Sequence, residues 1–425
     1  MMEIYRESEH RSLTETEILE DLKTLLAGYP SLKKVLIIPP DFTRFHSMAG
    51  EITGLLWREL KGHATVHVMP ALGTHMEMSD GERLKMFGPH IPKACFLTHR
   101  WQTDTVSIGR VPADVTEEIS GGLFATDIEV EVNKQLLSGG YDLILSVGQV
   151  VPHEVVGMAN YSKNIFVGIG GRQMINKTHM LGALCGIEEA LGNGDAPVRQ
   201  VFDYAQEHFL GDFPLVYILT VTTRHGRDTH LNGLYIGPSR RPYEEAVKLS
   251  QKLNITYLDR PVKKVVTYLD PHEFKTTWVG NKGIYRTRMI IADGGELLIL
   301  APGIRACGEN PEIDAIIRAY GYRGRNTTLK LYNEGVFENR TMVAAHLIHG
   351  STDGRFQVIY ATDPALFSGK EVEAIGYEHM ELAKALSIYD PDTLEDGFHT
   401  LPDGTDFYFV KAPAMGLWKL STGIS

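Results

Sequence analysis

Polar side chains follow two apolar runs near the start of the sequence, at points where buried strands would end. Asp41, Thr43 and Arg44 come directly after the run 34–40, and His75 follows the run 63–72. An arginine at such a place could bind a carboxylate or phosphate through its forked guanidinium, and Thr43 could cap the following helix. The alternatives are a capped helix with a surface ion pair and a histidine that is only a structural hydrogen-bond partner.

A second set of polar residues follows the apolar run 141–151. His153 comes directly after it, Lys163 ten residues later, and His179 sixteen residues after the lysine. The backbone N–H groups of the glycine-rich run 168–171 could receive a phosphate, although this run is not the G-x-G-x-x-G pattern of NAD-binding proteins. Each feature alone also fits an ordinary loop, an exposed lysine or a plain turn.

The three histidines lack the short spacing that is typical of zinc sites. None of the three belongs to an H-x-x-x-H pair or has an acidic cluster at short spacing. A zinc site built entirely from protein ligands is therefore not obvious from the sequence.

Short apolar runs alternate with helical patterns along the first part of the chain. The runs predicted as strands are 34–40, 63–72, 141–151, 164–169 and 213–223, and helical patterns cover 48–60, 175–191 and 196–208. This alternation predicts an α/β fold with a mostly parallel sheet flanked by helices. Ligand sites in such sheets lie beyond the carboxyl ends of the strands, so we expect the polar groups to meet in one crevice.

The length of 425 residues indicates two domains. We predict a larger N-terminal domain over 1–265 and a smaller C-terminal α/β domain over 270–405, with a hinge near 261–271 and an active-site cleft between them. The second domain would contain strands at 296–301 and 355–361 and helices at 312–320 and 341–348. The strand predicted at 406–410 would lead residues 406–425 back to the first domain.

Composition excludes several classes of protein. The formal net charge of -11 argues against a nucleic-acid-binding surface, which needs basic patches. The three cysteines are far apart, which indicates neither a disulfide framework nor a cysteine-rich metal site. The charged N-terminus does not resemble a signal peptide, and no apolar run is long enough to span a bilayer. We therefore expect a soluble cytoplasmic protein without a membrane or nucleic-acid partner.

In order along the chain, these motifs resemble the nickel-dependent lactate racemase family. The resemblance rests on Asp41, Thr43 and Arg44 after the first strand, the segment A-L-G-T-H that ends in His75, and the spacing of His153, Lys163 and His179. It implies a nickel-pincer nucleotide of the pyridinium-3,5-bisthiocarboxylic acid mononucleotide type, whose two sulfur atoms and one carbon bind nickel.

The resemblance also implies a role for each of these residues. Lys163 would tether the cofactor through one thiocarbonyl arm, and His179 would complete the square plane of nickel ligands, a geometry that suits Ni(II). Asp41, Thr43 and Arg44 would line the cofactor, and Arg44 would also face the substrate. His75 and His153 would be the acid/base pair.

The implied reaction is racemisation or epimerisation of a 2-hydroxy acid by reversible hydride transfer. The hydrogen on C2 is a very poor acid because the neighbouring carboxylate is already negative, so its removal as hydride avoids a dianion. Each enantiomer then needs its own base on its own side, and an imidazole with an ordinary pKa near 6.5 suits a group that is both base and acid. Enzymes that make the cofactor would be partners for loading.

The second domain departs from the family pattern. Lactate-specific members hold the substrate carboxylate with a glutamine and a lysine, for which the segment 310–318 offers only Arg318. The substrate is therefore lactate or a larger hydroxy acid such as a sugar acid, with Arg318, Arg305 and Arg323 as candidates for binding its carboxylate. His346 and His349 share a helix face and are expected to be helix polar residues first and substrate contacts second.

Two other functions fit the same residues. One is a lyase or hydrolase whose ordinary divalent metal is bound by His75, His153 and His179. The other is a protein that binds the nickel cofactor or a hydroxy acid without catalysis.

Overall fold

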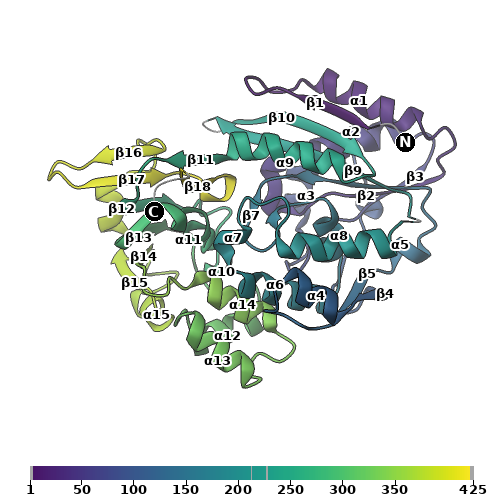
Figure 1. Cartoon of the computed structure of the whole chain (residues 1–425). Coiled ribbons are helices and arrows are strands. Elements are labelled where there is room, and N and C mark those ends of the chain that lie inside the picture. Colours follow the sequence, from purple (N-terminus) through teal and green to yellow (C-terminus); the bar gives the residue numbers. More distant parts are fainter. Residues whose placement is uncertain (1–2, 212, 226–227, 422–425) are drawn as a thin grey trace. The chain divides into compact units, whose positions relative to one another are not determined.

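The computed structural model describes residues 3–211, 213–225 and 228–421, which fall into two compact units. The first unit comprises Met1–Leu181 and Ala190–Asn254, and the second comprises Gly182–Glu189 and Ile255–Ser425. Both are α/β units with parallel-rich sheets, which confirms the predicted fold class (Figure 1). Within the described residues, no helix combines the length and hydropathy required to cross a bilayer.

The first unit is built on a six-stranded sheet. Its order is β1 (Ile4–Glu7), β10 (Asp228–Gly237), β9 (Leu215–His225), β6 (Leu143–Gln149), β2 (Lys34–Ile38) and β3 (Thr65–Val68). The strands β3, β2, β6 and β9 are parallel, and β10 and β1 continue the sheet in antiparallel fashion. Four of the runs predicted as strands in this unit are therefore confirmed.

Both faces of this sheet are covered by helices. Val35 and Ile37 of β2 join the core with α1 (Glu15–Ala27) and α2 (Ala49–Leu60), whereas Leu36 and Ile38, also fully buried, point to the opposite face because side chains alternate along a strand. On that opposite face, α8 (Pro197–Phe209) bonds to β9 through Gln206 and Tyr217, and α9 (Arg241–Asn254) contacts β9 and β10.

Shorter elements complete the first unit. Its remaining helices and strands are η1 (Phe42–Ser47), α3 (Asp80–Phe87), η2 (Lys93–Cys95), β4 (Thr105–Val111), α4 (Ala113–Ile119), β5 (Ile128–Asn133), α5 (Gln135–Ser138), β7 (Pro152–His153) and β8 (Gly157–Met158).

Two predictions of local structure between residues 164 and 191 are wrong. The run 164–169 is not a strand but a π-helical turn, η3 (Asn164–Gly168), because a short buried apolar run has no periodicity that separates strand from helix. The predicted helix 175–191 is α6 (Arg172–Cys185) followed by α7 (Ile187–Ala190), with Gly186 at φ 98° between them. That left-handed conformation interrupts the helix and suits glycine.

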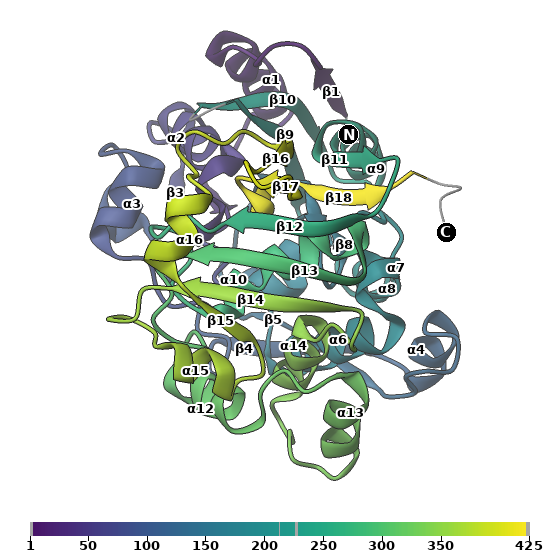
Figure 2. The same ribbon diagram turned by 90° about the vertical axis from the view of Figure 1, so that its left-hand side faces the viewer.

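The second unit is built on another six-stranded sheet (Figure 2). Its order is β15 (Glu378–Glu381), β14 (Phe356–Thr362), β13 (Ile291–Ala301), β12 (Val262–Tyr268), β17 (Asp406–Val410) and β16 (Gly397–Thr400). All neighbours are parallel except β16 and β17. Its helices are α10 (Thr277–Gly280), α11 (Lys282–Thr287), η4 (Arg288–Ile290), α12 (Pro311–Tyr320), α13 (Arg325–Asn333), α14 (Thr341–Gly350), α15 (Gly369–Ala374), α16 (Leu382–Ile388) and η5 (Pro413–Met415).

The C-terminal strands lie in the second unit, contrary to the predicted return to the first domain. β17 pairs with β12, and β18 (Leu417–Leu420) pairs in parallel with β11 (Ile255–Leu258). The first unit ends at Asn254, the last residue of α9, rather than at 265. A short apolar run predicts a strand but not its neighbour, since pairing depends on contacts distant in sequence.

Candidate active site

The predicted site residues of the first unit follow β2, β3 and β6. The chain runs from β2 to β3 on one side and later enters β6 on the other side of β2. The order of strands therefore reverses between β2 and β6, and in open parallel sheets such a switch point is where ligands bind. Asp41 follows β2, His75 follows β3 and His153 follows β6.

Asp41, which is buried, and His75, which is half-buried, form a hydrogen-bonded pair. His75 Nδ1 lies 2.6 Å from Asp41 Oδ2, while the other carboxylate oxygen accepts from Thr43 Oγ1 at 2.6 Å and from the Thr43 N–H at 3.2 Å. Asp41, rather than the predicted Thr43, is thus the N-cap of η1. Both of its oxygens bind protein groups, which makes Asp41 a support for His75.

Electrostatics keep the Asp41 carboxyl ionised. Burial raises its pKa, but His75, Thr43 and the charge of Arg44 together outweigh this effect, and the net pKa is lowered. An ionised carboxylate can only accept a hydrogen bond, so Nδ1 of the neutral His75 ring carries the hydrogen and the lone pair is on Nε2. Nε2 of His75 can therefore act as a base, and the carboxylate would stabilise the imidazolium that forms.

His153 has the opposite arrangement. It lies in the short ribbon of β7 and β8 and is buried, and its Nδ1 accepts hydrogen bonds from the Val155 N–H at 3.1 Å and the Val156 N–H at 3.5 Å. The neutral ring that accepts at Nδ1 carries its hydrogen on Nε2. His75 and His153 therefore differ in the hydrogen-bonding character of Nε2: the first accepts and the second donates.

His179 is a half-buried, neutral imidazole in α6. Its Nδ1–H donates to the carbonyl of Ile175 at 2.6 Å, which leaves the lone pair on Nε2. Burial lowers its pKa to about 4; the bond to Ile175 and the charge of Glu154 oppose this, and the nearby positive charge of Lys163 adds to it. A neutral histidine whose second nitrogen donates to a backbone carbonyl is the usual form of a metal ligand.

The segment that follows Lys163 is fastened to the strand ends at the switch point. Asn164 Nδ2 donates to the carbonyl of Ile38 at 2.9 Å and to Ser146 Oγ at 3.0 Å, which ties η3 to β2 and β6. The Gly73 N–H donates to the carbonyl of Gly168 at 2.8 Å, which ties the loop after β3 to the same turn. Lys163 therefore lies next to the ends of three strands.

The glycine-rich run does not present its backbone as a phosphate site. The Gln173 N–H at the start of α6 donates to the carboxylate of Glu131 at 2.6 Å. A Cβ on Gly171 would collide with the Glu131 side chain, and one on Gly170 would collide with the carbonyl of Phe166. These glycines allow close packing within the protein, and a carboxylate already occupies the helix N-terminus.

Arg318 of the second unit is engaged with acidic side chains. Its Nε lies 2.6 Å from Asp314 Oδ2 and its Nη1 lies 2.9 Å from Glu371 Oε1. Two carboxylates next to the guanidinium would repel a third, so we do not assign the substrate carboxylate to Arg318. Arg323 donates to the carbonyl of Ala374, and Arg305 is exposed.

His346 and His349 lie in α14 as predicted, and both are buried. His346 is bonded to the hydroxyls of Tyr285 at 2.9 Å and Tyr322 at 2.7 Å and stacks on Trp278. With both nitrogens of its ring bonded to tyrosines, His346 belongs to the interior of the second unit.

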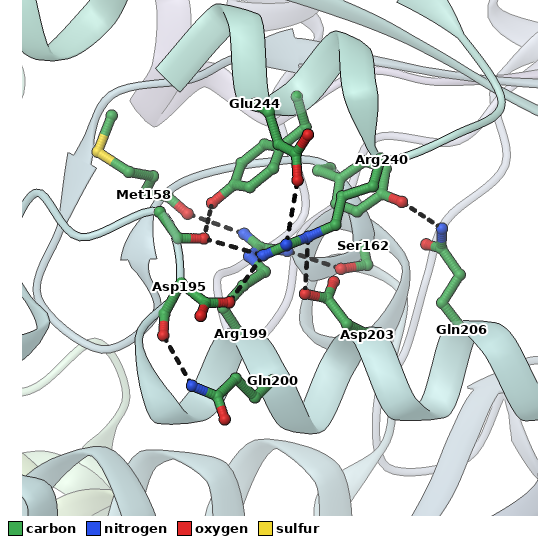
Figure 3. Close-up of polar contacts among 12 residues, drawn as sticks. Met158, Ser162, Asp195, Arg199, Gln200, Asp203, Gln206, Arg240 and Glu244 are labelled. Atoms are coloured by element: carbon green, nitrogen blue, oxygen red, sulfur yellow. Dashed lines mark hydrogen bonds and ion pairs between the residues drawn. The ribbon is translucent and has the colours of Figure 1, made fainter. Parts of the chain in front are cut away.

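The buried side chains that support the Lys163 loop were not predicted from the sequence. Arg199 in α8 is fully buried and bonds to Ser162, and Asp203 lies one helical turn further on (Figure 3). A charged residue in an amphipathic helix normally indicates the exposed face. Three buried apolar residues lie near Arg199 in the same helix: Val198, Val201 and Phe202. Their pattern could have indicated that the Arg199 side chain is buried.

The chain is thus a two-unit α/β protein with a histidine–aspartate pair at the switch point of its first sheet. Residues 10–191 match the family model described as the lactate racemase N-terminal domain. No curated protein matches the sequence. The matched segment is less than half of the chain, and it shows that this part of the chain resembles the N-terminal domain of lactate racemases.

Two solved structures have the same fold over nearly the whole chain. A Thermotoga maritima protein from a structural genomics programme is 26% identical, with a TM-score of 0.84 and coverage of 98% of this chain and 100% of that chain. The lactate racemase apoprotein from Thermoanaerobacterium thermosaccharolyticum is 18% identical, with a TM-score of 0.68 and coverage of 96% and 94%. At that identity, the second likeness shows the fold alone.

Proposed function

We propose that this chain is a racemase or epimerase that inverts C2 of a 2-hydroxy acid with the help of a nickel-pincer nucleotide. One observation carries the proposal: an ionised Asp41 orients His75 at the switch point of a unit whose sequence matches the lactate racemase N-terminal domain. The pair supplies a base at the place where parallel sheets bind ligands.

The residues near Lys163 fit the cofactor. His179 offers a lone pair on Nε2 because its Nδ1–H is held by the Ile175 carbonyl, and burial keeps the ring neutral at pH 7. Lys163 lies close enough for its charge to affect His179, so the amine and the imidazole are near each other. We assign the covalent tether to Lys163 and the nickel ligand to His179.

In the part of the chain that the structure describes, no group of three or more histidine, cysteine, aspartate or glutamate side chains is placed to hold a metal ion. A cofactor that brings most of its own donors needs only one protein ligand. An ordinary metal bound by His75, His153 and His179 would need all three together, so the structure gives no support to the lyase or hydrolase alternative.

The acid and base work falls to two histidines. The cofactor, held by Lys163 and His179, would supply reversible hydride transfer to and from C2, by way of a planar 2-keto acid that has two equivalent faces. His75 takes the hydroxyl proton at Nε2, and the Asp41 carboxylate stabilises its imidazolium. His153 donates from Nε2 to a substrate oxygen and must give up its Nδ1 bonds to the backbone before it can act as the base for the other enantiomer.

We assign Arg44 to the anionic part of the cofactor or substrate because it lies in η1, three residues after Asp41. The substrate is lactate or a larger hydroxy acid such as a sugar acid. Arg318 is paired to two carboxylates and is not assigned to the substrate.

The test uses protein produced together with the cofactor-making enzymes, and a panel of chiral 2-hydroxy acids. Loss of optical purity should follow nickel content, and His75→Ala and His153→Ala should each abolish it while nickel stays bound. His67→Gln is the matched control, because His67 lies in β3 and bonds to Tyr141. Full activity in both alanine variants would refute the assigned pair.

Two results would favour the other functions. Turnover restored by zinc or manganese in protein without a nucleotide would favour the ordinary metalloenzyme. Absence of turnover across the panel with fully loaded protein would favour a binding protein.

A further inference from the structure

The loop that carries Lys163 has an unusual backbone. It connects β8 to η3, and two consecutive residues that are not glycine, Asn160 at φ 63° and Tyr161 at φ 55°, are left-handed. Such residues keep this conformation only when surrounding contacts enforce it. The loop is therefore shaped by its neighbours rather than by its own preferences.

A single buried side chain bonds to three alternate residues of this loop. Arg199 Nη2 donates to the carbonyls of Met158 at 2.8 Å and Asn160 at 3.0 Å, and Nη1 donates to Ser162 Oγ at 2.6 Å (Figure 3). Arg199 is fully buried, and its guanidinium lies 4.5 Å from the ring centroid of Tyr243. Only the planar guanidinium has the fixed donors that match three such acceptors.

The cost of burying this charge indicates a definite role for it. Arg199 lies in α8 one turn before Asp203, which in turn lies 3.1 Å from Nε of Arg240. Isolated charges are rarely buried, and an apolar residue would fill the same space without desolvation. What an apolar residue could not provide at this position is the set of three hydrogen bonds that Arg199 donates to the loop.

The loop is also held from its other sides. Tyr161 stacks on Tyr243 with ring centroids 5.0 Å apart, and its hydroxyl accepts from Gln206 Nε2 at 2.5 Å. Asn164, on the far side of Lys163, is bonded to β2 and β6. Lys163 thus lies between Ser162, which Arg199 holds, and Asn164, which the sheet holds.

We propose that Arg199 is a positioning residue that fixes the backbone of Lys163 for attachment of the cofactor, an inference that rests on the proposed function of that lysine. The guanidinium stabilises the left-handed turn at Asn160 and Tyr161. This turn then determines the direction in which the Lys163 side chain extends from the loop. Arg199 acts through its hydrogen bonds to Ser162 and to the carbonyls of Met158 and Asn160.

The first measurement is amide hydrogen exchange in protein made without the cofactor-making enzymes. The N–H groups of Ala159, Tyr161 and Asn164 are all hydrogen-bonded in the loop. In Arg199→Met, we expect their exchange to be at least tenfold faster. In Ser162→Ala, which removes one acceptor and spares the charge, we expect a rise of a few fold.

Arg240→Met is the matched control. Arg240 lies in the same cluster and pairs with Asp195, Asp203 and Glu244. Its loss should leave exchange in the loop unchanged. Wild-type exchange in Arg199→Met, or the same increase in Arg240→Met, would overturn the proposal; if Arg199→Met does not fold, wild-type exchange in Ser162→Ala would overturn it.

The second measurement is the fraction of chains with added mass at Lys163 after production with the cofactor-making enzymes. Arg199→Met should load at least fivefold less than Arg240→Met at equal thermal stability, and Arg199→Lys should recover part of the loss. Equal loading would overturn the proposal. If the wild-type chain gains no mass, the function proposed for Lys163 fails, while the exchange measurement still decides whether Arg199 holds the loop.

Discussion

Replacing Asp41 with asparagine tests the central pair with almost no change in shape. Thr43 donates to Oδ1 of Asp41 through both its N–H and its hydroxyl, so an asparagine would place its carbonyl oxygen there. The NH2 group of the asparagine would then face Nδ1 of His75, and this nitrogen would have to accept a hydrogen bond instead of donating one. The ring hydrogen would move to Nε2, the atom that must take the substrate proton.

The size of the effect follows from the geometry. Two unit charges about 4 Å apart at an effective dielectric constant of about 20 interact by about 4 kcal/mol. The His75 side chain is 31% exposed, so we halve this figure to about 2 kcal/mol, or about 30-fold in rate. The reversed hydrogen bond adds about 1 to 1.5 kcal/mol. We expect Asp41→Asn to lower kcat/KM by about 300-fold.

The assay is loss of optical purity of the best substrate at pH 7, with nickel content and thermal unfolding measured on the same sample. Thr43→Val is the control, since it removes one donor to Asp41 and keeps the charge. It should lose less than about fivefold, about the value of one hydrogen bond. A loss below threefold in Asp41→Asn, or an equal loss in Thr43→Val, would refute the role given to the carboxylate.

Three further predictions concern residues around the site. Burial raises the pKa of Asp203 to about 6, so the contribution of this carboxyl to stability is fully present below about pH 4 and is lost as pH rises through about 6. Asp203→Asn should remove this decline, which is at most about 3 kcal/mol, in urea unfolding at several pH values. His179→Ala should reduce nickel content by at least about tenfold while intact mass still shows the attached nucleotide; retained nickel would contradict its assignment. In Gly148→Ala, the new Cβ would collide with Asn160 Nδ2. We expect the free energy of unfolding to fall by about 1–3 kcal/mol and the attachment of cofactor at Lys163 to decrease. Unchanged stability would show that the loop can move away from the added methyl group.

The sequence predicted much of the framework. The runs around β2, β6 and β9 were recognisable because each matches a strand that is largely buried on both faces. The run around β3 was recognisable although this edge strand buries only its alternate residues. The positions of Asp41, His75 and His153 directly after those strands were also predictable, since polar residues that end a buried strand emerge at the edge of the sheet. Local periodicity contains this information, and no knowledge of distant contacts is required.

The tertiary structure decided what the local pattern leaves open. It made 164–168 a π-helical turn, because Asn164 found partners in two strands, and it paired 406–410 with β12. It placed a carboxylate behind His75 and backbone N–H groups against Nδ1 of His153, which gives two identical side chains different chemistry. It also buried Arg199. Hydrogen-bond partners, pKa values and burial depend on residues that are far apart in sequence, and only folding brings them together.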